Sequence, residues 1–155
     1  MPRQSAGLIM YRVRNGAPEL LLVHPGGPFW ARKDLGAWSI PKGEYLEGED
    51  PLQAARREFR EETGHEPSGS FIELDRIRQP GGKLVRAWAF SGDFDPGHLV
   101  SNTFTMEWPP RSGRQTRFPE VDRACWFGID EAREKILPGQ LPLIDQVAAL
   151  LRSAG

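Results

Sequence analysis

The stretch that decides the fold spans residues 43–64 and reads GEYLEGEDPLQAARREFREETG. From Asp50 onward it has the pattern of one helix, with Asp50 as a good N-cap, a proline at the first helical position and a glycine at the end. Residues three and four apart share a helix face, so Glu58, Glu61 and Glu62 gather on one side. Like charges on one face repel each other, and a purely structural helix avoids them.

A hard divalent cation turns this repulsion into binding. Mg²⁺ and Mn²⁺ take carboxylate oxygens together with water and substrate phosphates. The three carboxylates therefore predict a metal site suited to phosphate chemistry. The rival interpretation is that the acidic helix is only a solvated surface. Glutamine should then replace each glutamate without loss of activity.

The same stretch resembles the Nudix box, the motif of the Nudix hydrolases: Gly-x5-Glu-x7-Arg-Glu, an apolar residue, any residue, Glu-Glu, any residue, Gly and an apolar residue. Every specified letter is present, at Gly43, Glu49, Arg57, Glu58, Glu61, Glu62 and Gly64. Phe59 fills the first apolar position, whereas His65 occupies the second and puts only local packing in doubt. The resemblance implies an α+β fold, a Nudix-type α/β/α sandwich with a mixed β-sheet and the box as loop–helix–loop.

The resemblance also implies roles for the box residues. The metal ligands would be the carbonyl of Gly43 and the carboxylates of Glu58, Glu61 and Glu62. Arg57 would fix the rotamer of an acid, since Glu61 lies one turn further on, and Glu49 would hold the loop. The general base stays open between Glu58 and an acid of a later loop.

Two later acids are candidates for that base. Glu120 precedes the apolar run at residues 124–127, where many Nudix enzymes place an additional acid, and it is equally well explained as a solvated loop residue. Glu107 is a weaker candidate for the same role.

Two further segments bear on the substrate. Residues 38–43, WSIPKG, resemble the diadenosine tetraphosphate hydrolase branch, in which the lysine, here Lys42, faces the polyphosphate. The segment 24–33, HPGGPFWARK, resembles bacterial MutT-type proteins. Its Trp30, Arg32 and Lys33 suit a base stacked over a phosphate-binding patch. The alternative is a basic surface loop with Trp30 packed beneath it.

The expected activity is Mg²⁺- or Mn²⁺-dependent hydrolysis of a phosphoanhydride in a nucleoside diphosphate linked to another group. The leading substrate class is the dinucleoside polyphosphates, such as diadenosine tetraphosphate, which would give ATP and AMP. The alternatives are a MutT-like nucleoside triphosphate pyrophosphohydrolase acting on damaged nucleotides, and an ADP-ribose or nucleotide-sugar pyrophosphatase. A non-catalytic nucleotide-binding Nudix domain is the rival of a different class, but such domains usually lose a box acid or the arginine.

Composition fits a single domain over residues 1–155, with 39% hydrophobic and 26% charged residues. A net charge of −1 argues against a general nucleic-acid or membrane-surface binder, so we expect a small nucleotide substrate and a monomer or homodimer. Cys125 is the only cysteine, which excludes an internal disulfide and fits the cytoplasm. The absence of a GxxxxGK[ST] motif argues against a P-loop nucleotidase.

Hydrophobic patterning predicts the remaining elements. Strands are expected at 6–13, 19–24, 38–40 and 124–129, a hairpin at 71–78 and 84–94, and helices at 130–137 and 141–152. We expect a basic loop that contains Arg111, Arg114 and Arg117, and core positions for Trp88, Trp108 and Trp126.

Overall fold

The computed structural model describes residues 4–154 of the chain. Its strands are β1 (Gln4–Arg14), β2 (Ala17–Pro25), β3 (Lys42–Glu44), β4 (Ile72–Glu73), β5 (Ile77–Arg78), β6 (Leu84–Ser91), β7 (Thr103–Glu107), β8 (Gln115–Pro119) and β9 (Val121–Gly128). Its α-helices are α1 (Pro51–Thr63), α2 (Ile129–Lys135) and α3 (Leu141–Ala154), and two short 3-10 helices span Pro96–His98 and Pro138–Gln140.

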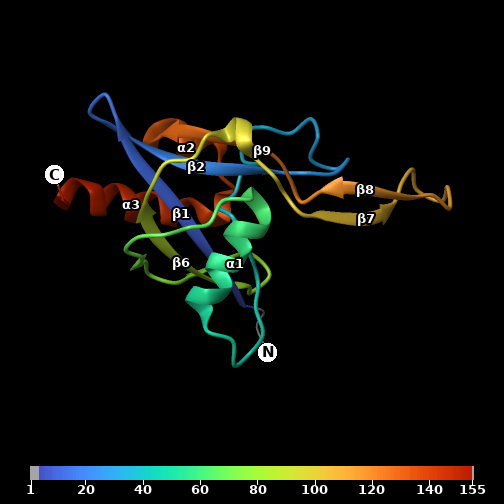
Figure 1. Cartoon of the computed structure of the whole chain (residues 1–155), viewed down its shortest axis with the longest axis horizontal. Coiled ribbons are helices and arrows are strands. Elements are labelled where there is room, and N and C mark those ends of the chain that lie inside the picture. Colours follow the sequence, from blue (N-terminus) through green and yellow to red (C-terminus); the bar gives the residue numbers. More distant parts are fainter. Residues whose placement is uncertain (1–3, 155) are drawn as a thin grey trace.

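Seven strands form one mixed sheet through the middle of the molecule (Figure 1). Its order is β4-β6-β1-β2-β9, with β3 paired to β1 and β5 paired to β6. β1 and β6 run parallel, and the other described pairs of this sheet are antiparallel. β1 and β2 are central because they carry continuous buried apolar runs, which a strand covered on both faces requires.

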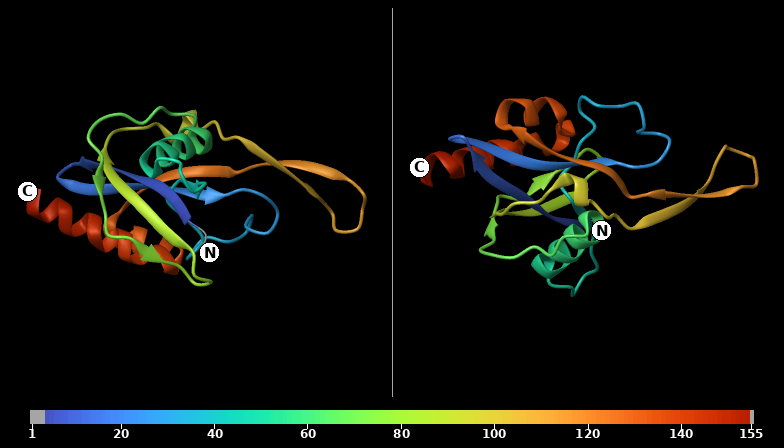
Figure 2. Two further views of the ribbon diagram at one scale, coloured as in Figure 1. Left: turned by 90° about the horizontal axis from the view of Figure 1, so that it is seen from below. Right: turned by 45° about the horizontal axis from the view of Figure 1, so that its top comes forward.

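Helices cover both faces of this sheet (Figure 2). α1 packs on one face through the fully buried Phe59, whose ring meets Phe90 of β6 edge-on at 5.4 Å between centroids. α3 packs on the other face through Leu143 and Val147. The α+β sandwich expected from the sequence is confirmed. No helix within residues 4–154 is long and apolar enough to cross a membrane.

Local sequence explains where α1 begins and ends. Pro51 occupies the first turn, and Gly64 ends the helix with a φ of 79°, its N–H donating to the carbonyl of Arg60 at 2.8 Å. The expected N-cap at Asp50 is present by position only, because its side chain accepts no capping hydrogen bond. The Asp50 carbonyl instead accepts the N–H of Ala54 at 3.0 Å.

The strand expected over residues 71–78 is divided into β4 and β5. The backbone N–H of Asp75 donates to Oε1 of Gln146 on α3 at 2.6 Å, which takes this residue out of the ladder. The pairing of β5 with β6 is therefore shifted by one residue relative to the pairing of β4 with β6.

The strand expected over residues 38–40 is also shorter in the structure. Ser39 exchanges two backbone hydrogen bonds with Val23 of β2, at 2.8 and 2.9 Å, and this pair is an isolated bridge. Pro41 follows soon after, and because proline lacks an N–H it cannot continue the ladder.

Arg111 and Arg114 lie in a loop as expected, whereas Arg117 lies on a strand. This loop joins β7 and β8 into a two-stranded hairpin, which projects from the body of the molecule (Figure 1). Phe104 and Phe118 face each other across it, with ring centroids 5.9 Å apart. Trp108 lies at this hairpin, 5.6 Å from the ring of Phe29, so its expected core position is wrong. The sequence signal for this hairpin is the alternation of polar and apolar residues over 103–108, TFTMEW, just before the turn over residues 109–113.

Replacing Phe59 with alanine should lower the free energy of unfolding by about 3–5 kcal/mol, because it leaves a cavity between α1 and the sheet. The control Leu46→Ala, at a position 77% exposed, should change it by less than about 0.5 kcal/mol. Urea denaturation of both variants measures the difference. Equal losses would contradict the packing of α1 described above.

Candidate active site

Arg57 on α1 is the centre of an ionic network. Its guanidinium donates to the carboxylates of Glu49 and of Glu58, the latter at 3.3 Å. Its Nε lies 3.7 Å from Oε1 of Glu61, one helical turn further on. One cation therefore offsets the charge of three box acids and restricts the rotamers of each.

Glu49 ties the loop before α1 to this network. One of its oxygens accepts the backbone N–H of Leu46 at 3.0 Å, and the other binds Arg57. These two hydrogen bonds hold the pKa of Glu49 below its usual range. Glu49 thus stays ionised and keeps the loop bent toward the helix.

Gly43 on β3 lies directly against Glu58. A Cβ at this glycine would stand 2.2 Å from Cδ of Glu58, so any larger residue would force this carboxylate to move. Burial raises the pKa of Glu58, and the hydrogen bond from Arg57 opposes that rise. β3 is positioned by its pairing with residues 5–7 of β1.

A cleft of about 380 Å³ opens between the end of β2, β3 and α1. Its lining residues are Val23, Pro25, Ser39, Ile40, Lys42, Gly43, Glu44, Glu62, Lys83, Glu120, Val121 and Leu137. Four of the predicted site residues meet in it, namely Lys42, Gly43, Glu62 and Glu120. It lies beside the carboxylates of α1, so it is the candidate active site.

The charges of Glu62 and Lys42 interact in this cleft. Burial raises the pKa of Glu62 to about 8, and the negative charge of Glu58 adds to the rise, while Lys42 opposes it. Burial also lowers the pKa of Lys42. Both groups are thus partly stripped of water, which strengthens their interactions with a charged ligand.

Lys83 and Glu44 also line the cleft, although no sequence motif indicates either residue. Lys83 follows the Pro80–Gly82 turn, where the sequence indicates only the bend of a hairpin. Its amine lies 3.9 Å from a carboxylate oxygen of Glu44. The parallel pairing of β6 with β1 brings Lys83 to the cleft, and no local pattern predicts that pairing.

Glu120 is anchored to α1 through the main chain. Its N–H donates to the carbonyl of Asn102 at 2.8 Å, and the N–H of Asn102 donates to the carbonyl of Glu61 at 2.8 Å. Its own carbonyl accepts the N–H of Gly26 at 2.9 Å. The charge of Glu120 contributes to the raised pKa values of Glu58 and Glu62, which places its carboxylate near them.

The predicted ligands offer the oxygen donors that a hard divalent cation takes. Gly43 offers a carbonyl next to the Glu58 carboxylate, and Glu62 lies in the same cleft. Within residues 4–154, however, no three His, Cys, Asp or Glu side chains stand close enough to form a finished cage. Arg57 draws Glu58 and Glu61 toward itself, so completing a metal site requires rotation of these side chains.

The loop over residues 26–37 places three predicted substrate contacts outside this cleft's lining. Trp30 packs partly against the core, Lys33 lies 5.1 Å above the Trp30 ring, and Arg32 is exposed. The buried His24 positions the loop, because its Nε2 lies 2.7 Å from the carbonyl of Lys33 and its Nδ1 lies 2.8 Å from Asp122. A substrate role for this loop stays a prediction.

Comparison with known proteins decides the family. The model of the NUDIX domain family matches residues 1–147. The chain belongs to the Nudix family. This confirms the resemblance read from the box, and Nudix enzymes as a family use divalent metal ions.

Among curated Nudix relatives, an RNA pyrophosphohydrolase of Rhodospirillum rubrum is 28% identical, over 97% of this chain and 92% of its own. An 8-oxo-(d)GTP phosphatase of Mycolicibacterium smegmatis is 32% identical over 64% of this chain, which spans about a quarter of that protein, 26%. These relatives place the chain among hydrolases that act on pyrophosphate bonds.

A solved structure of a Caenorhabditis elegans Ap4A hydrolase complex has a TM-score of 0.66 at 23% identity, covering 97% of this chain and 98% of that one. At this identity the likeness supports the fold alone.

In the presence of a chelator, Glu62→Gln should stabilise the protein increasingly as pH rises from 5 to 8. Because folding raises the pKa of Glu62 to about 8, the unfolded chain loses this proton first and wild-type stability falls over that window. Glutamine cannot ionise, so the gain should reach on the order of 4 kcal/mol at pH 8. Urea denaturation at each pH measures it. The exposed Glu47→Gln control should show no such trend.

Proposed function

We propose that this Nudix enzyme uses Mg²⁺ or Mn²⁺ to hydrolyse a phosphoanhydride bond in a nucleotide polyphosphate that carries a further group. The observation that carries the proposal is the cleft in which Lys42 and Lys83 lie beside Glu62, Glu120 and Gly43. The lysine side chains would bind phosphate oxygens, and the carbonyl and carboxylate oxygens would hold the metal. We place the reaction in the cytoplasm, a reducing compartment that a lone cysteine fits.

In this reaction water attacks one phosphorus, the bridging P–O bond breaks, and the leaving phosphate keeps the electron pair. A bound divalent cation supplies positive charge that offsets the charge of the phosphates. Gly43, Glu58, Glu61 and Glu62 would hold it. Arg57 and Glu49 orient those acids. Glu58 or Glu120 takes the proton from water, and the raised pKa of Glu58 suits a base.

Two substrates of this class have separate support. Dinucleoside polyphosphates such as diadenosine tetraphosphate are favoured by the Pro41-Lys42-Gly43 segment and would yield ATP and AMP. RNA with a 5′ triphosphate is favoured by the end-to-end alignment with an RNA pyrophosphohydrolase and would yield 5′-monophosphate RNA and pyrophosphate. Damaged nucleoside triphosphates, ADP-ribose and nucleotide sugars are less favoured as substrates than these two.

Replacing Glu58, Glu61 or Glu62 with glutamine should each lower kcat/KM by about 10²–10⁴-fold while leaving the circular dichroism spectrum unchanged, because each change removes a charged ligand or base. Glu47→Gln is the matched control, since Glu47 lies within the box at an unspecified, exposed position. Steady-state kinetics with Mg²⁺ measures the effect. Retained activity in all three variants would favour the solvated-helix interpretation.

Product chromatography tests the substrate class. The panel contains diadenosine tetraphosphate, 5′-triphosphorylated RNA, 8-oxo-dGTP, ADP-ribose and a nucleotide sugar, each with Mg²⁺, with Mn²⁺ and with chelator. Metal-dependent cleavage of the first two is the expected result. No turnover of any member would contradict a catalytic role and favour a nucleotide-binding domain.

A further inference from the structure

The hairpin over residues 103–119, which we name the arm, stands apart from the main sheet (Figure 1). β7 and β8 pair only with each other among the described strands. An isolated two-stranded hairpin is marginally stable in water, so it needs outside support. Little of that support comes from the main core, so the arm requires an explanation beyond packing.

The loop over residues 26–37 packs along the arm, from Phe104 near its base to Trp108 beside its turn. A Cβ at Gly27 would lie 3.0 Å from the ring of Phe104, and Phe29 meets Trp108 edge-to-face at 5.6 Å. Phe29 is 63% exposed and Trp108 is half-buried. The junction of loop and arm thus presents two aromatic rings at the surface, a feature typical of a binding site.

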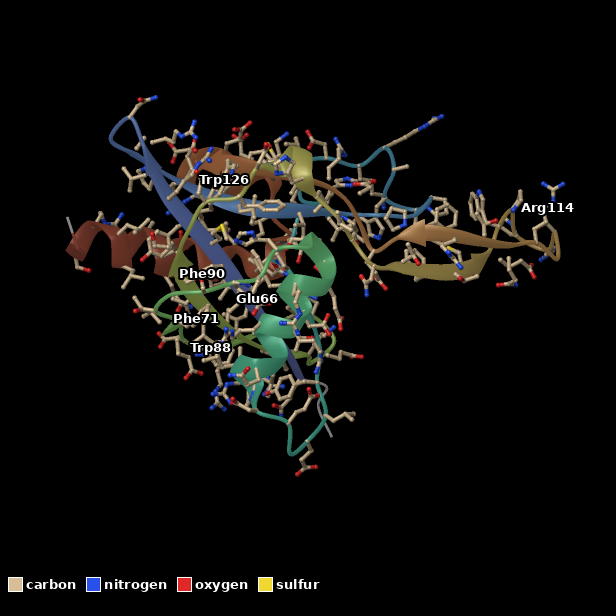
Figure 3. All side chains as sticks on the ribbon, in the orientation of Figure 1. Glu66, Phe71, Trp88, Phe90, Arg114 and Trp126 are labelled. Carbon is tan, nitrogen blue, oxygen red and sulfur yellow. The ribbon has the colours of Figure 1, made fainter. Side chains whose placement is uncertain are left out.

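The arm carries concentrated positive charge. It contains Arg111, Arg114 and Arg117 and a single acid, Glu107, in a chain whose net charge is −1. The three arginines are exposed, and none forms an ion pair within residues 4–154. Figure 3 shows Arg114 at the far end of the arm, pointing away from the body. Glu107 is engaged locally, since its carboxylate accepts the N–H of Arg111 at 2.6 Å.

The arm begins at the candidate active site. β8 ends at Pro119, and the next residue, Glu120, lines the cleft. Five residues of β8 span about 17 Å at the usual rise of a strand. Arg114 therefore lies beyond the reach of a mononucleotide whose phosphates sit at Lys42, whereas a nucleotide chain that leaves the cleft along the arm reaches it.

We propose that the arm binds the single-stranded nucleotide chain of RNA whose 5′ polyphosphate occupies the cleft. Bases stack on Phe29 and Trp108, and backbone phosphates pair with Arg111, Arg114 and Arg117. The inference rests on the proposed function and selects RNA from its two substrates. A dinucleoside polyphosphate has no phosphates beyond its second nucleoside to meet the arginines. The expectation of no nucleic-acid partner rested on net charge, which averages over this local concentration.

The test compares wild type with the triple variant R111Q/R114Q/R117Q. kcat/KM is measured for a nucleoside triphosphate, diadenosine tetraphosphate, and 5′-triphosphorylated RNA of two and twelve nucleotides. Fluorescence anisotropy measures binding of a twelve-nucleotide RNA with a 5′-hydroxyl, which contains no bond for the enzyme to cleave. This second readout stays informative even if the proposed hydrolysis fails.

The matched control is R14Q/R76Q/R152Q. It removes the same charge at three exposed arginines of the body that lie outside the arm and the cleft lining and form none of the described ion pairs. The arm variant should lose about tenfold in kcat/KM and in affinity for the twelve-nucleotide RNAs, and less than twofold for the mononucleotide and diadenosine tetraphosphate. Wild-type binding should weaken by about 20-fold from 50 to 200 mM salt, as three phosphate contacts predict.

The other outcomes overturn the inference. Equal losses on all substrates would make the arm a part of the catalytic structure. Equal losses in both triple variants would show that the effect comes from net charge and not from the arm. Wild-type activity that is independent of RNA length would remove the need for an extended site. A dimer that dissociates in the arm variant, measured by light scattering, would identify a second copy of the chain as the occupant.

Discussion

The ion network of Arg57 is the interaction on which the arrangement of the site depends. A helix with three glutamates on one face is electrostatically unfavourable, and the sequence places the compensating cation on the same turn. The same guanidinium reaches out to Glu49 and so fixes the loop that precedes the helix. Exposed ion pairs are individually weak, but a cation shared by several acids restricts geometry even where it adds little stability.

The sheet supplies the second half of the site. β3 is only three residues long, yet it sets Gly43 against Glu58 and Lys42 against Glu62. It is held by β1, the strand that also pairs in parallel with β6 and so delivers Lys83. The cleft thus draws Lys42 and Glu44 from β3 and Lys83 from the residue before β6. Glu62 comes from α1, and Glu120 follows β8.

The family resemblance supplied the sandwich architecture, whereas local patterns in the sequence were sufficient for the helix of the box and the two long central strands. Each depends on periodicity or on specific end residues, which neighbouring amino acids determine. What failed depends on contacts across long sequence distances. The hydrogen bond from Asp75 to Gln146 broke a strand that its own residues favour, and the parallel β1–β6 pair placed Lys83. The sequence did not predict the arm as a hairpin, because its alternating pattern is short and is interrupted by prolines and arginines.

The main-chain bond between Glu120 and Asn102 closes the two ends of the arm onto each other. The cleft therefore meets the arm only at these two bonded ends. The rest of the arm can change in length or composition while Glu120 keeps its position. Loop closure costs rise slowly with added residues, so such changes are cheap in stability. Variation in the arm therefore offers an evolutionary route to new substrates, because the arm can change while the residues of the cleft stay the same.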